Sequence, residues 1–255
     1  MDSIEESLKT RWLGRNYLYF DSLTSTNDKA YEVAENKAPM GTVIVANSQT
    51  RGRGRRGRQW LSPADDGLWF SLILRPSLAP KDAMALTLVT AVGICRGLDH
   101  YSGLGAAIKW PNDIWVREQK LCGILSEMKA EEEKICYVVI GIGVNIRTTA
   151  IEGEVAQTAV GMEEVLTEDI DKRELLCRLL FGLETAYDSY FNGEVQSLIE
   201  EWEERSFLLN REVEVSTANG SVSGTVLGLS PEGFLRILTE DKKVAHIISG
   251  DIALK

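Results

Sequence analysis

The sequence predicts an α+β protein in two parts: a larger domain of strands and helices over residues 1–208, and a small all-β domain over residues 209–255. Two patterns lead to this prediction. Apolar residues recur at helical spacing over 81–101, whereas short runs rich in β-branched residues lie on either side of that segment. After residue 210, the chain holds only short strand-like runs separated by turns. With 255 residues, of which 44% are hydrophobic, the chain can bury a substantial core.

In the larger domain, local patterns assign the elements in order. Residues 3–11 have helical spacing, and Ser25 or Thr26 can cap a second helix that runs to about Asn36. Apolar or β-branched runs predict short strands at 16–20, 42–46, 68–76, 108–110 and 114–116. Two longer runs predict adjacent central strands joined by an acidic hairpin, at 120–128 and 135–146. The segment 147–170 is expected to be irregular, and two helices are predicted near 171–192 and 194–206.

The C-terminal part has a different pattern. Short strands are predicted at 211–215, 221–230, 234–239 and 244–249. They are separated by Asn219-Gly220, by Pro231-Glu232-Gly233 and by a charged turn at 240–243. Asn-Gly is a strong signal for a two-residue hairpin turn. Four short strands in so few residues predict a small barrel.

Composition excludes several classes of protein. The chain has 28 Lys+Arg against 38 Asp+Glu, a net charge of −10. The N-terminus is acidic and polar, unlike a secretory signal, and no apolar run is long enough to span a bilayer. Four dispersed cysteines and two histidines argue against a disulfide framework, a zinc site and a Ser-His-Asp triad. We therefore expect a cytoplasmic protein that does not engage a membrane.

The segment 51–58, which reads RGRGRRGR, is the strongest local signal. Glycine lets the backbone take up positive φ and approach a ligand closely. The guanidinium forks of arginine match phosphate or carboxylate oxygens. Composition alone fits an RNA-binding tract equally well. However, a single tract between two buried strands of an acidic chain favours a site for one small anion, in a loop that becomes ordered when the anion binds.

Other short motifs are weak one by one. Lys109 ends a strand before a Pro-Asn-Asp turn, and Lys120 begins an apolar strand. The run GIGVN at 141–145 places small residues in a central strand, which is typical of the close approach of a ligand or another backbone. Ser25-Thr26-Asn27 by itself predicts only a helix cap.

Together and in this order, the motifs resemble those of the bacterial biotin–protein ligases, in the form without an N-terminal DNA-binding domain. The resemblance covers nearly the whole chain, with Ser25-Thr26-Asn27, Q-x-x-G-R-G-R-R-G-R-x-W at 49–60, KWPNDI at 109–114, K-L-x-G-I-L at 120–125 and G-I-G-x-N at 141–145. The glycine–arginine signature is highly specific. Arg51 stands where many members have a small residue. The resemblance implies a mixed sheet with flanking helices, like a class II aminoacyl-tRNA synthetase core, followed by an SH3-like barrel.

The resemblance also implies a reaction in two half-steps. The biotin carboxylate attacks the α-phosphate of ATP, which gives biotinyl-5′-AMP and pyrophosphate. A lysine of the biotin carboxyl carrier protein of a biotin-dependent carboxylase then attacks the anhydride, and AMP leaves. ATP and biotin are thus substrates, and Mg²⁺ is expected to neutralise the phosphates, with its protein ligands left open. Joining two anions requires fixed cations, which the arginines and lysines of the motifs supply.

Site residues are carried over motif by motif. The catalytic candidates are Lys120, Arg55, Lys109 and Asp113. The candidates for binding biotin are Ser25, Thr26, Asn27, Gln49, Gly52, Arg53, Gly54, Arg55 and Lys120. The candidates for binding ATP or the adenylate are Arg53, Arg55, Arg56, Arg58, Trp60, Lys109, Asn112, Lys120, Gly143 and Asn145. Residues near 157–161 are expected on the adenine side.

Partners and alternatives complete the expectation. Residues 1–24 leave no room for a DNA-binding domain before Ser25, so specific DNA binding is not expected, and a homodimer is left open. A lipoate–protein ligase or related acyl transferase would share the fold, but its pocket would be apolar throughout. Transferases also need a nucleophilic cysteine, and Cys122 is expected to be inert in the core. An RNA-binding protein would explain only 51–58, and a carrier with Lys129 as its acceptor would need no arginine loop.

Overall fold

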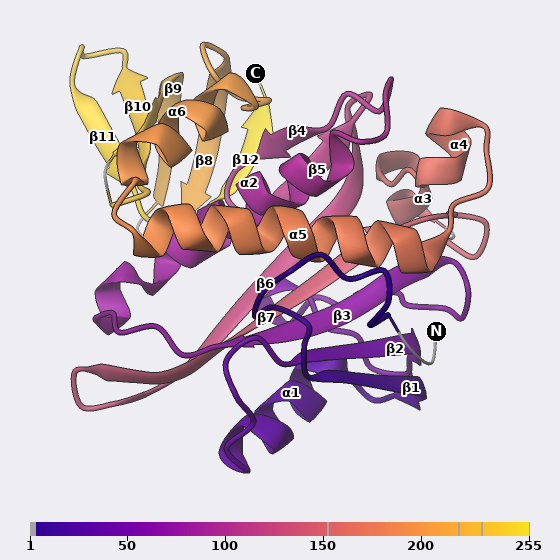
Figure 1. Ribbon diagram of the computed structural model, residues 1–255. Helices are drawn as coiled ribbons and strands as arrows, with labels where there is room; N and C mark the ends of the chain where they lie inside the picture. The colour runs from indigo at the N-terminus through magenta and orange to yellow at the C-terminus, as the bar shows by residue number, and fades with distance from the viewer. Residues whose placement is uncertain (1–3, 152, 219, 231, 255) are drawn as a thin grey trace.

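A seven-stranded mixed sheet forms the larger part of the protein (Figure 1). The computed structural model describes residues 4–151, 153–218, 220–230 and 232–254. The strand order is β1-β2-β3-β7-β6-β5-β4, with β1 parallel to β2 and the other neighbours antiparallel. The strands are β1 (Tyr17–Leu23), β2 (Val43–Gln49), β3 (Gly67–Leu74), β4 (Ala107–Lys109), β5 (Asp113–Val116), β6 (Gln119–Glu131) and β7 (Lys134–Asn145). This sheet confirms the predicted fold class and the central pairing of β6 with β7.

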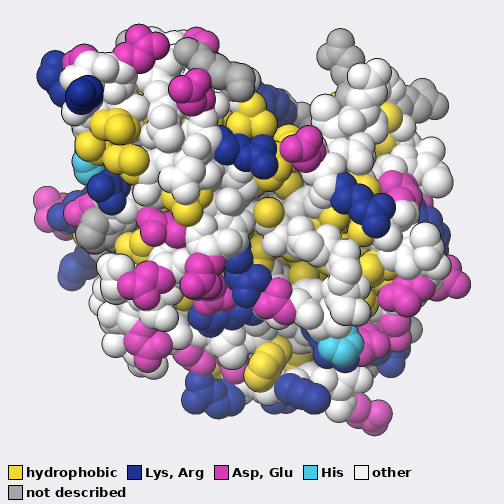
Figure 2. Space-filling view, turned by 90° about the horizontal axis from the view of Figure 1, so that it is seen from above, with side chains coloured by type: hydrophobic (Ala, Val, Ile, Leu, Met, Phe, Trp, Pro, Cys, Tyr) yellow, Lys and Arg dark blue, Asp and Glu magenta, His cyan; other side chains and the backbone are white. Residues whose placement is uncertain are grey.

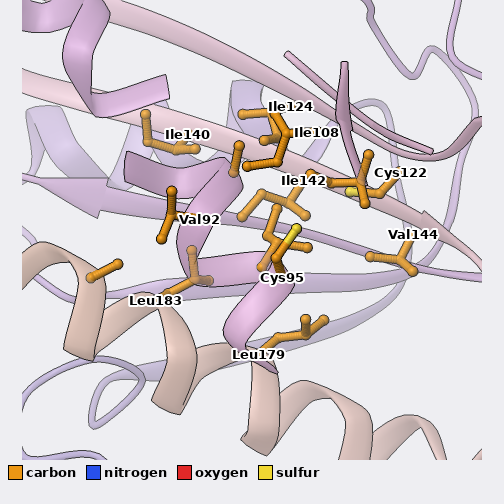
Figure 3. Close-up of a cluster of buried hydrophobic side chains, with 14 of the residues drawn as sticks. Val92, Cys95, Ile108, Cys122, Ile124, Ile140, Ile142, Val144, Leu179 and Leu183 are labelled. Atoms are coloured by element: carbon orange, nitrogen blue, oxygen red, sulfur yellow. The ribbon is translucent and has the colours of Figure 1, made fainter. Parts of the chain in front are cut away.

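Helices cover both faces of the sheet. The long helices α2 (Ala83–Leu98) and α5 (Lys172–Phe191) pack against each other on one face, and α1 (Thr26–Glu35) lies on the other (Figure 1). Figure 3 shows side chains of α2, α5 and alternate residues of β7 in one buried cluster: Val92, Cys95, Leu179, Leu183, Ile140, Ile142 and Val144. Successive strand residues point to opposite faces, so the residues between these isoleucines face the side of α1.

Two segments differ from the sequence prediction. Residues 4–16 form turns and irregular structure instead of the expected helix. The carboxylate of Glu184, a buried residue of α5, accepts hydrogen bonds from the backbone amides of Arg11, Trp12 and Leu13 at 2.7, 2.8 and 2.9 Å. A tertiary contact thus replaces the helical hydrogen bonds there. The segment 147–170, expected to be irregular, contains the short helices α3 (Glu154–Thr158) and α4 (Met162–Leu166).

The C-terminal part is an antiparallel sheet in the order β11-β10-β9-β8-β12. Its strands are β8 (Glu212–Thr217), β9 (Gly220–Leu229), β10 (Leu235–Thr239), β11 (Val244–Ile247) and β12 (Asp251–Leu254). Four of these were predicted, whereas β12 was missed because it is short and carries a charged first residue. Asn219 and Pro231, which belong to two of the predicted turns, lie outside the described residues. The division of the chain at residue 208 stays a prediction.

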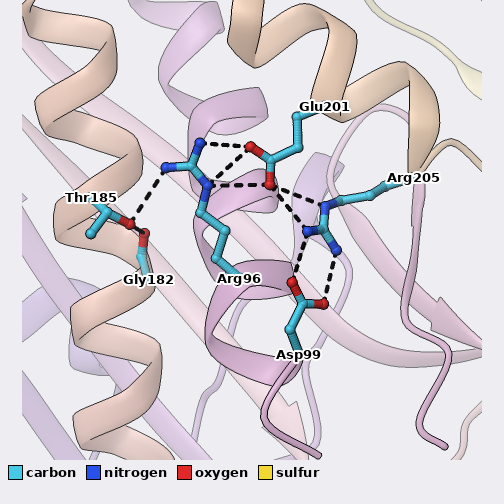
Figure 4. Close-up of polar contacts among 6 residues, drawn as sticks. All are labelled: Arg96, Asp99, Gly182, Thr185, Glu201 and Arg205. Atoms are coloured by element: carbon cyan, nitrogen blue, oxygen red, sulfur yellow. Dashed lines mark hydrogen bonds and ion pairs between the residues drawn. The ribbon is translucent and has the colours of Figure 1, made fainter. Parts of the chain in front are cut away.

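The link between the two sheets is well anchored. After helix α6 (Val195–Glu204), the chain pairs with the edge strand β4: Ile108 N–H donates to Arg205 O and Phe207 N–H donates to Ile108 O, both at 2.8 Å. Arg96 of α2 pairs with Glu201 at 2.6 Å, and Arg205 pairs with Asp99 at 2.8 Å (Figure 4). These contacts fix where the C-terminal strands begin, next to β4 and β5.

Charges are mixed on the surface. On the face seen from above in Figure 2, lysine and arginine side chains stand beside aspartate and glutamate side chains, with no single basic patch. Among the described residues, no helix is both long and apolar enough to cross a membrane.

Candidate active site

One pocket of about 390 Å³ gathers most of the residues that the sequence singled out. It opens on the sheet face opposite α2 and α5, between β6, β7, the start of α1 and the arginine–glycine loop. The predicted residues that line it are Ser25, Thr26, Asn27, Gln49, Arg53, Gly54, Arg55, Arg58, Trp60, Lys109, Asn112, Asp113, Lys120 and Gly143. Residues from segments that are distant in sequence thus meet at one site.

The floor of the pocket consists of glycines on two paired strands. Gly123 of β6 lies opposite Gly143 of β7. A Cβ at Gly143 would lie 2.5 Å from Nε1 of Trp60, and one at Gly141 would lie 2.3 Å from Oδ1 of Asn27. The sequence predicted the approach of a ligand or another backbone here. Two side chains, Trp60 and Asn27, occupy the space instead, and they shape the pocket walls.

A network of uncharged polar groups forms one end of the pocket. Gln49 Oε1 accepts a hydrogen bond from Thr26 N–H at 2.8 Å, and Gln49 Nε2 donates to Ser62 Oγ at 2.8 Å. Ser71 Oγ lies 2.7 Å from Thr26 Oγ1 and 2.6 Å from Asn27 Oδ1. Within the described chain, the Ser25 hydroxyl makes no capping hydrogen bond to α1, although Ser25 is the N-cap residue.

Carboxylates hold Arg53 at the same end. Arg53 pairs with Asp28 and, at 2.8 Å, with Glu127. The same Glu127 oxygen accepts a hydrogen bond from Asn27 Nδ2 at 2.7 Å. Arg53 was expected to bind both biotin and phosphate. Its carboxylate partners place Arg53 at the polar end. There it links the loop to α1 through Asp28 and to β6 through Glu127.

Cations gather at the other end. Lys120 Nζ forms an ion pair with Asp113 at 2.7 Å and lies 5.1 Å from the centroid of the Trp60 ring. Lys109 is the cross-strand partner of Asp113, and its Nζ lies 3.8 Å from the Trp115 ring centroid. Asp113 thus pairs with Lys120 and lies opposite Lys109 across two strands, and it stays a candidate for orienting the lysines or for holding a metal ion.

Arg55 completes this cationic end. Its Nη1 donates to Asn112 Oδ1 at 3.0 Å, and Asn112 Nδ2 donates to Ile124 O at 2.8 Å. Burial, reinforced by the neighbouring Arg56, lowers the pKa of Arg55. Burial also lowers the pKa of Lys109, against the attraction of Asp113. Both cations are thus partly desolvated, which strengthens their attraction for an anion.

The arginine–glycine loop forms the rim. A Cβ at Gly52 would lie 2.3 Å from the carbonyl oxygen of Trp60, so glycine is required there for close backbone approach. Gly57 has φ of +74°, whereas Gly54 is extended, and Arg56 itself takes up positive φ of 56°. Positive φ was expected of the glycines in general, yet in this loop it is confined to one glycine and one arginine.

Replacing Gly52 by alanine is therefore expected to displace the loop and lower activity strongly. The added methyl group would press on a backbone oxygen, which cannot move without shifting the Trp60 backbone. Gly54→Ala serves as the matched comparison, because its Cβ would meet its nearest atom, Arg58 O, at an ordinary 3.4 Å. Steady-state kinetics of both variants should show the larger loss for Gly52→Ala. Equal losses would mean that crowding at Gly52 does not position the loop.

Three predicted residues do not line the pocket. Gly52 packs against the backbone of Trp60, and Arg56 pairs with Asp251. Asn145 is buried and its side-chain amide donates to the backbone oxygen of Lys120 at 3.3 Å, so it helps to fix the backbone of Lys120.

The lining also includes residues that were not named one by one as candidates: Gly123, Gly141, Val155, Thr158, Asp251 and Ile252. Gly123 and Gly141 belong to the motifs at 120–125 and 141–145, whereas Val155, Asp251 and Ile252 were missed. Thr158 falls in the stretch expected on the adenine side, which reaches the pocket because Val160 N–H donates to Lys120 O at 3.1 Å. Asp251 and Ile252 carried no local signal, because only the packing of β12 brings them to the site.

A nucleophilic cysteine lacks support in the geometry. Cys122 is fully buried on the side of α2, and burial raises the pKa of its thiol well above the usual range. It is the inert core residue that the sequence predicted, not a nucleophile. In the described part of the chain, no group of three or more His, Cys, Asp or Glu residues is arranged to hold a metal ion.

Comparisons with known proteins agree with this geometry. Residues 17–145 match the Biotin/lipoate A/B protein ligase family, and residues 208–255 match the Biotin protein ligase C terminal domain. The bifunctional ligase/repressor BirA of Bacillus subtilis is 36% identical over 98% of this chain and 78% of its own length. The biotin–[acetyl-CoA-carboxylase] ligase of Paracoccus denitrificans is 30% identical over 83% and 89%.

A solved structure is similar over nearly the whole fold. The biotin protein ligase from Aquifex aeolicus, in complex with biotin and ATP, superposes with a TM-score of 0.82 at 29% identity. The superposition covers 94% of this chain and 99% of the other. The similarity includes both the seven-stranded sheet and the C-terminal strands.

Proposed function

Because the chain belongs to the biotin/lipoate A/B protein ligase family, we propose that it is a biotin–protein ligase. It activates biotin with ATP as biotinyl-5′-AMP and transfers the biotinyl group to a lysine of a biotin carboxyl carrier protein. The observation that carries the proposal is the polarity of one pocket. Hydrogen-bonded polar groups and Arg53, neutralised by its carboxylate partners, lie at one end, and Lys109, Lys120, Arg55 and Arg58 lie at the other. Such a pocket fits a molecule that has a neutral polar head and a carboxylate tail.

In this proposal the polar end holds the ureido ring. Thr26, Asn27 and Gln49 supply donors and acceptors that are already oriented by hydrogen bonds, and the hydroxyl of Ser25 adds another polar group. A buried site built from such groups discriminates strongly against an apolar head, because its polar atoms would be left unpaired. Trp60 and the glycine floor form the apolar wall along the ring and its chain.

The cationic end supports adenylate formation. Lys120 binds the biotin carboxylate and then the α-phosphate, while Lys109, Arg55 and Arg58 offset the phosphate charge. Lys120 and Arg55 are held by Asp113 and Asn112 before the substrates arrive, so they stabilise the charge of the transition state with little reorganisation. Asp113 keeps Lys120 aimed into the pocket through their ion pair. Mg²⁺ would accompany ATP and take its ligands mainly from phosphate oxygens.

The carrier lysine attacks the anhydride in the second step. The carrier is proposed to be that of acetyl-CoA carboxylase, as the name of the Paracoccus relative states for that enzyme. The chemistry needs no protein nucleophile, since the ε-amine of the carrier lysine displaces AMP directly. This agrees with the burial of Cys122 away from the pocket.

The decisive experiment is incubation of the protein with biotin, ATP, Mg²⁺ and a carrier domain, followed by intact-mass analysis of the carrier. We expect the addition of one biotinyl group, dependent on ATP. A carrier whose acceptor lysine is replaced by arginine is the control and should stay unmodified. A parallel reaction with lipoate tests the alternative. A mass gain with lipoate and none with biotin would overturn the proposal in favour of a lipoate–protein ligase.

A further inference from the structure

Two arginines of the loop share one carboxylate from the far end of the chain. Arg56 Nη1 lies 2.5 Å and Arg58 Nη2 lies 2.8 Å from the same Oδ2 of Asp251. Asp251 is the first residue of β12 and is 195 residues away from Arg56 in sequence. The C-terminal sheet therefore supplies a negative charge to the rim of a pocket that lies mainly on the larger sheet.

The position of this carboxylate is set by strand pairing. Asp251 lies opposite Ser216 of β8 in the antiparallel pair. A Cβ on the preceding Gly250 would lie 2.4 Å from Cγ1 of Val215 and 2.9 Å from the Ser216 oxygen. The backbone before Asp251 is thus packed tightly against β8. The carboxylate is held from a sheet, whereas the arginines belong to a loop rich in glycine.

The contact with Asp251 offsets part of the positive charge at the rim of the pocket. Arg55, Arg56 and Arg58 follow one another closely along the loop and repel one another. Among the described residues, the ion pairs of Arg56 and Arg58 are both made with Asp251. Arg58 and Asp251 both line the pocket, together with Arg55, so the pair stands among the cations that would attract phosphate groups.

We infer that Asp251 is an internal counter-ion, which holds Arg56 and Arg58 at the rim until a polyphosphate replaces it. A polyphosphate offers more charge and more acceptor oxygens than one carboxylate, so it outcompetes Asp251 for the guanidinium groups. The contact exists in the ligand-free protein and is given up in the complex, so it opposes binding and favours the departure of pyrophosphate. This inference rests on the proposed function only in requiring a polyphosphate in the pocket.

Asp251→Asn tests the inference, because it removes the charge and keeps the size of the side chain. Trypsin cleaves after arginine, so the rate of cleavage within 51–58 reports directly on the loop. In the ligand-free variant we expect cleavage to be several-fold faster than in the unaltered protein. We also expect inorganic pyrophosphate to bind roughly two- to tenfold more tightly, as measured by calorimetry, because its competitor has been removed. At saturating pyrophosphate, both proteins should be cleaved at the same slow rate.

Two further variants serve as controls. Asp241→Asn makes the same chemical change in the turn between β10 and β11, where Asp241 pairs with Lys243. In this variant the segment 51–58 should be cleaved as in the unaltered protein. Asp251→Glu keeps the charge and should largely restore slow cleavage. Thermal melting of each variant checks that the fold is intact.

Three results would overturn the inference. Equal cleavage rates in the ligand-free Asp251→Asn and unaltered proteins would mean that Asp251 does not hold the loop. Weaker binding of pyrophosphate by the variant would mean that Asp251 prepares the arginines for phosphate instead of competing with it. A lack of protection by pyrophosphate in the unaltered protein would exclude the exchange altogether. None of these measurements involves biotin, so they can fail or succeed separately from the transfer assay.

Discussion

Replacing Lys120 by alanine is expected to lower the rate of adenylate formation roughly ten- to a hundredfold while the fold stays intact. Its ammonium group lies at the cationic end, 2.7 Å from Asp113, and its side chain is 29% exposed. Loss of a charge-assisted contact to a partly desolvated anion costs about 1.5–3 kcal/mol, which gives this range. The strand should persist, because Asn145 and Val160 bind the backbone oxygen of Lys120, which alanine retains.

The measurement is release of pyrophosphate from biotin and ATP without a carrier, which isolates the first half-reaction. Lys134→Ala is the matched control, since Lys134 is an exposed lysine at the start of the neighbouring strand β7. It should release pyrophosphate at the unaltered rate. Near-normal release by Lys120→Ala would remove Lys120 from the proposed catalytic role.

Replacing Arg55 by glycine is expected to weaken retention of biotinyl-5′-AMP by at least roughly tenfold. The half-buried guanidinium donates to Asn112 at 3.0 Å and lines both the main pocket and an adjoining cavity of about 130 Å³. Its loss removes one fork to the phosphate and opens the rim between the two spaces. The reactive anhydride should then escape and acylate unrelated lysines in solution.

This leakage can be detected with a bystander protein that lacks a carrier fold. Its biotinylation in the presence of biotin and ATP should rise with Arg55→Gly and stay at background with Arg51→Gly. Arg51 is an exposed arginine of the same loop that does not line the pocket, so the control makes the same substitution nearby. Absence of bystander labelling by Arg55→Gly would mean that Arg55 does not retain the intermediate.

The sequence alone predicted the elements that carry a local signal. Periodicity placed α2, because the apolar residues of a helix that packs on a sheet recur every three or four positions. Runs of β-branched residues located β2, β3, β6 and β7, which are buried on at least one face. The residue types of the arginine–glycine loop also indicated a site for a small anion. The lysine motifs, in contrast, were given a role only through their resemblance to those of biotin–protein ligases.

Only the tertiary structure decided which groups meet. Residues 4–16 do not form the expected helix, because the carboxylate of Glu184 in α5 accepts hydrogen bonds from three backbone amides of this segment. The tertiary structure also assigned Arg53 to Glu127 and Arg56 to Asp251, partners that lie 74 and 195 residues away in sequence. Local patterns report the backbone preference and the buried face of a segment, whereas pairing between distant charges depends on how the sheets are placed. The sequence therefore determined the cations and the polar groups of the site, and the fold determined which of them face the pocket and which carboxylates hold them there.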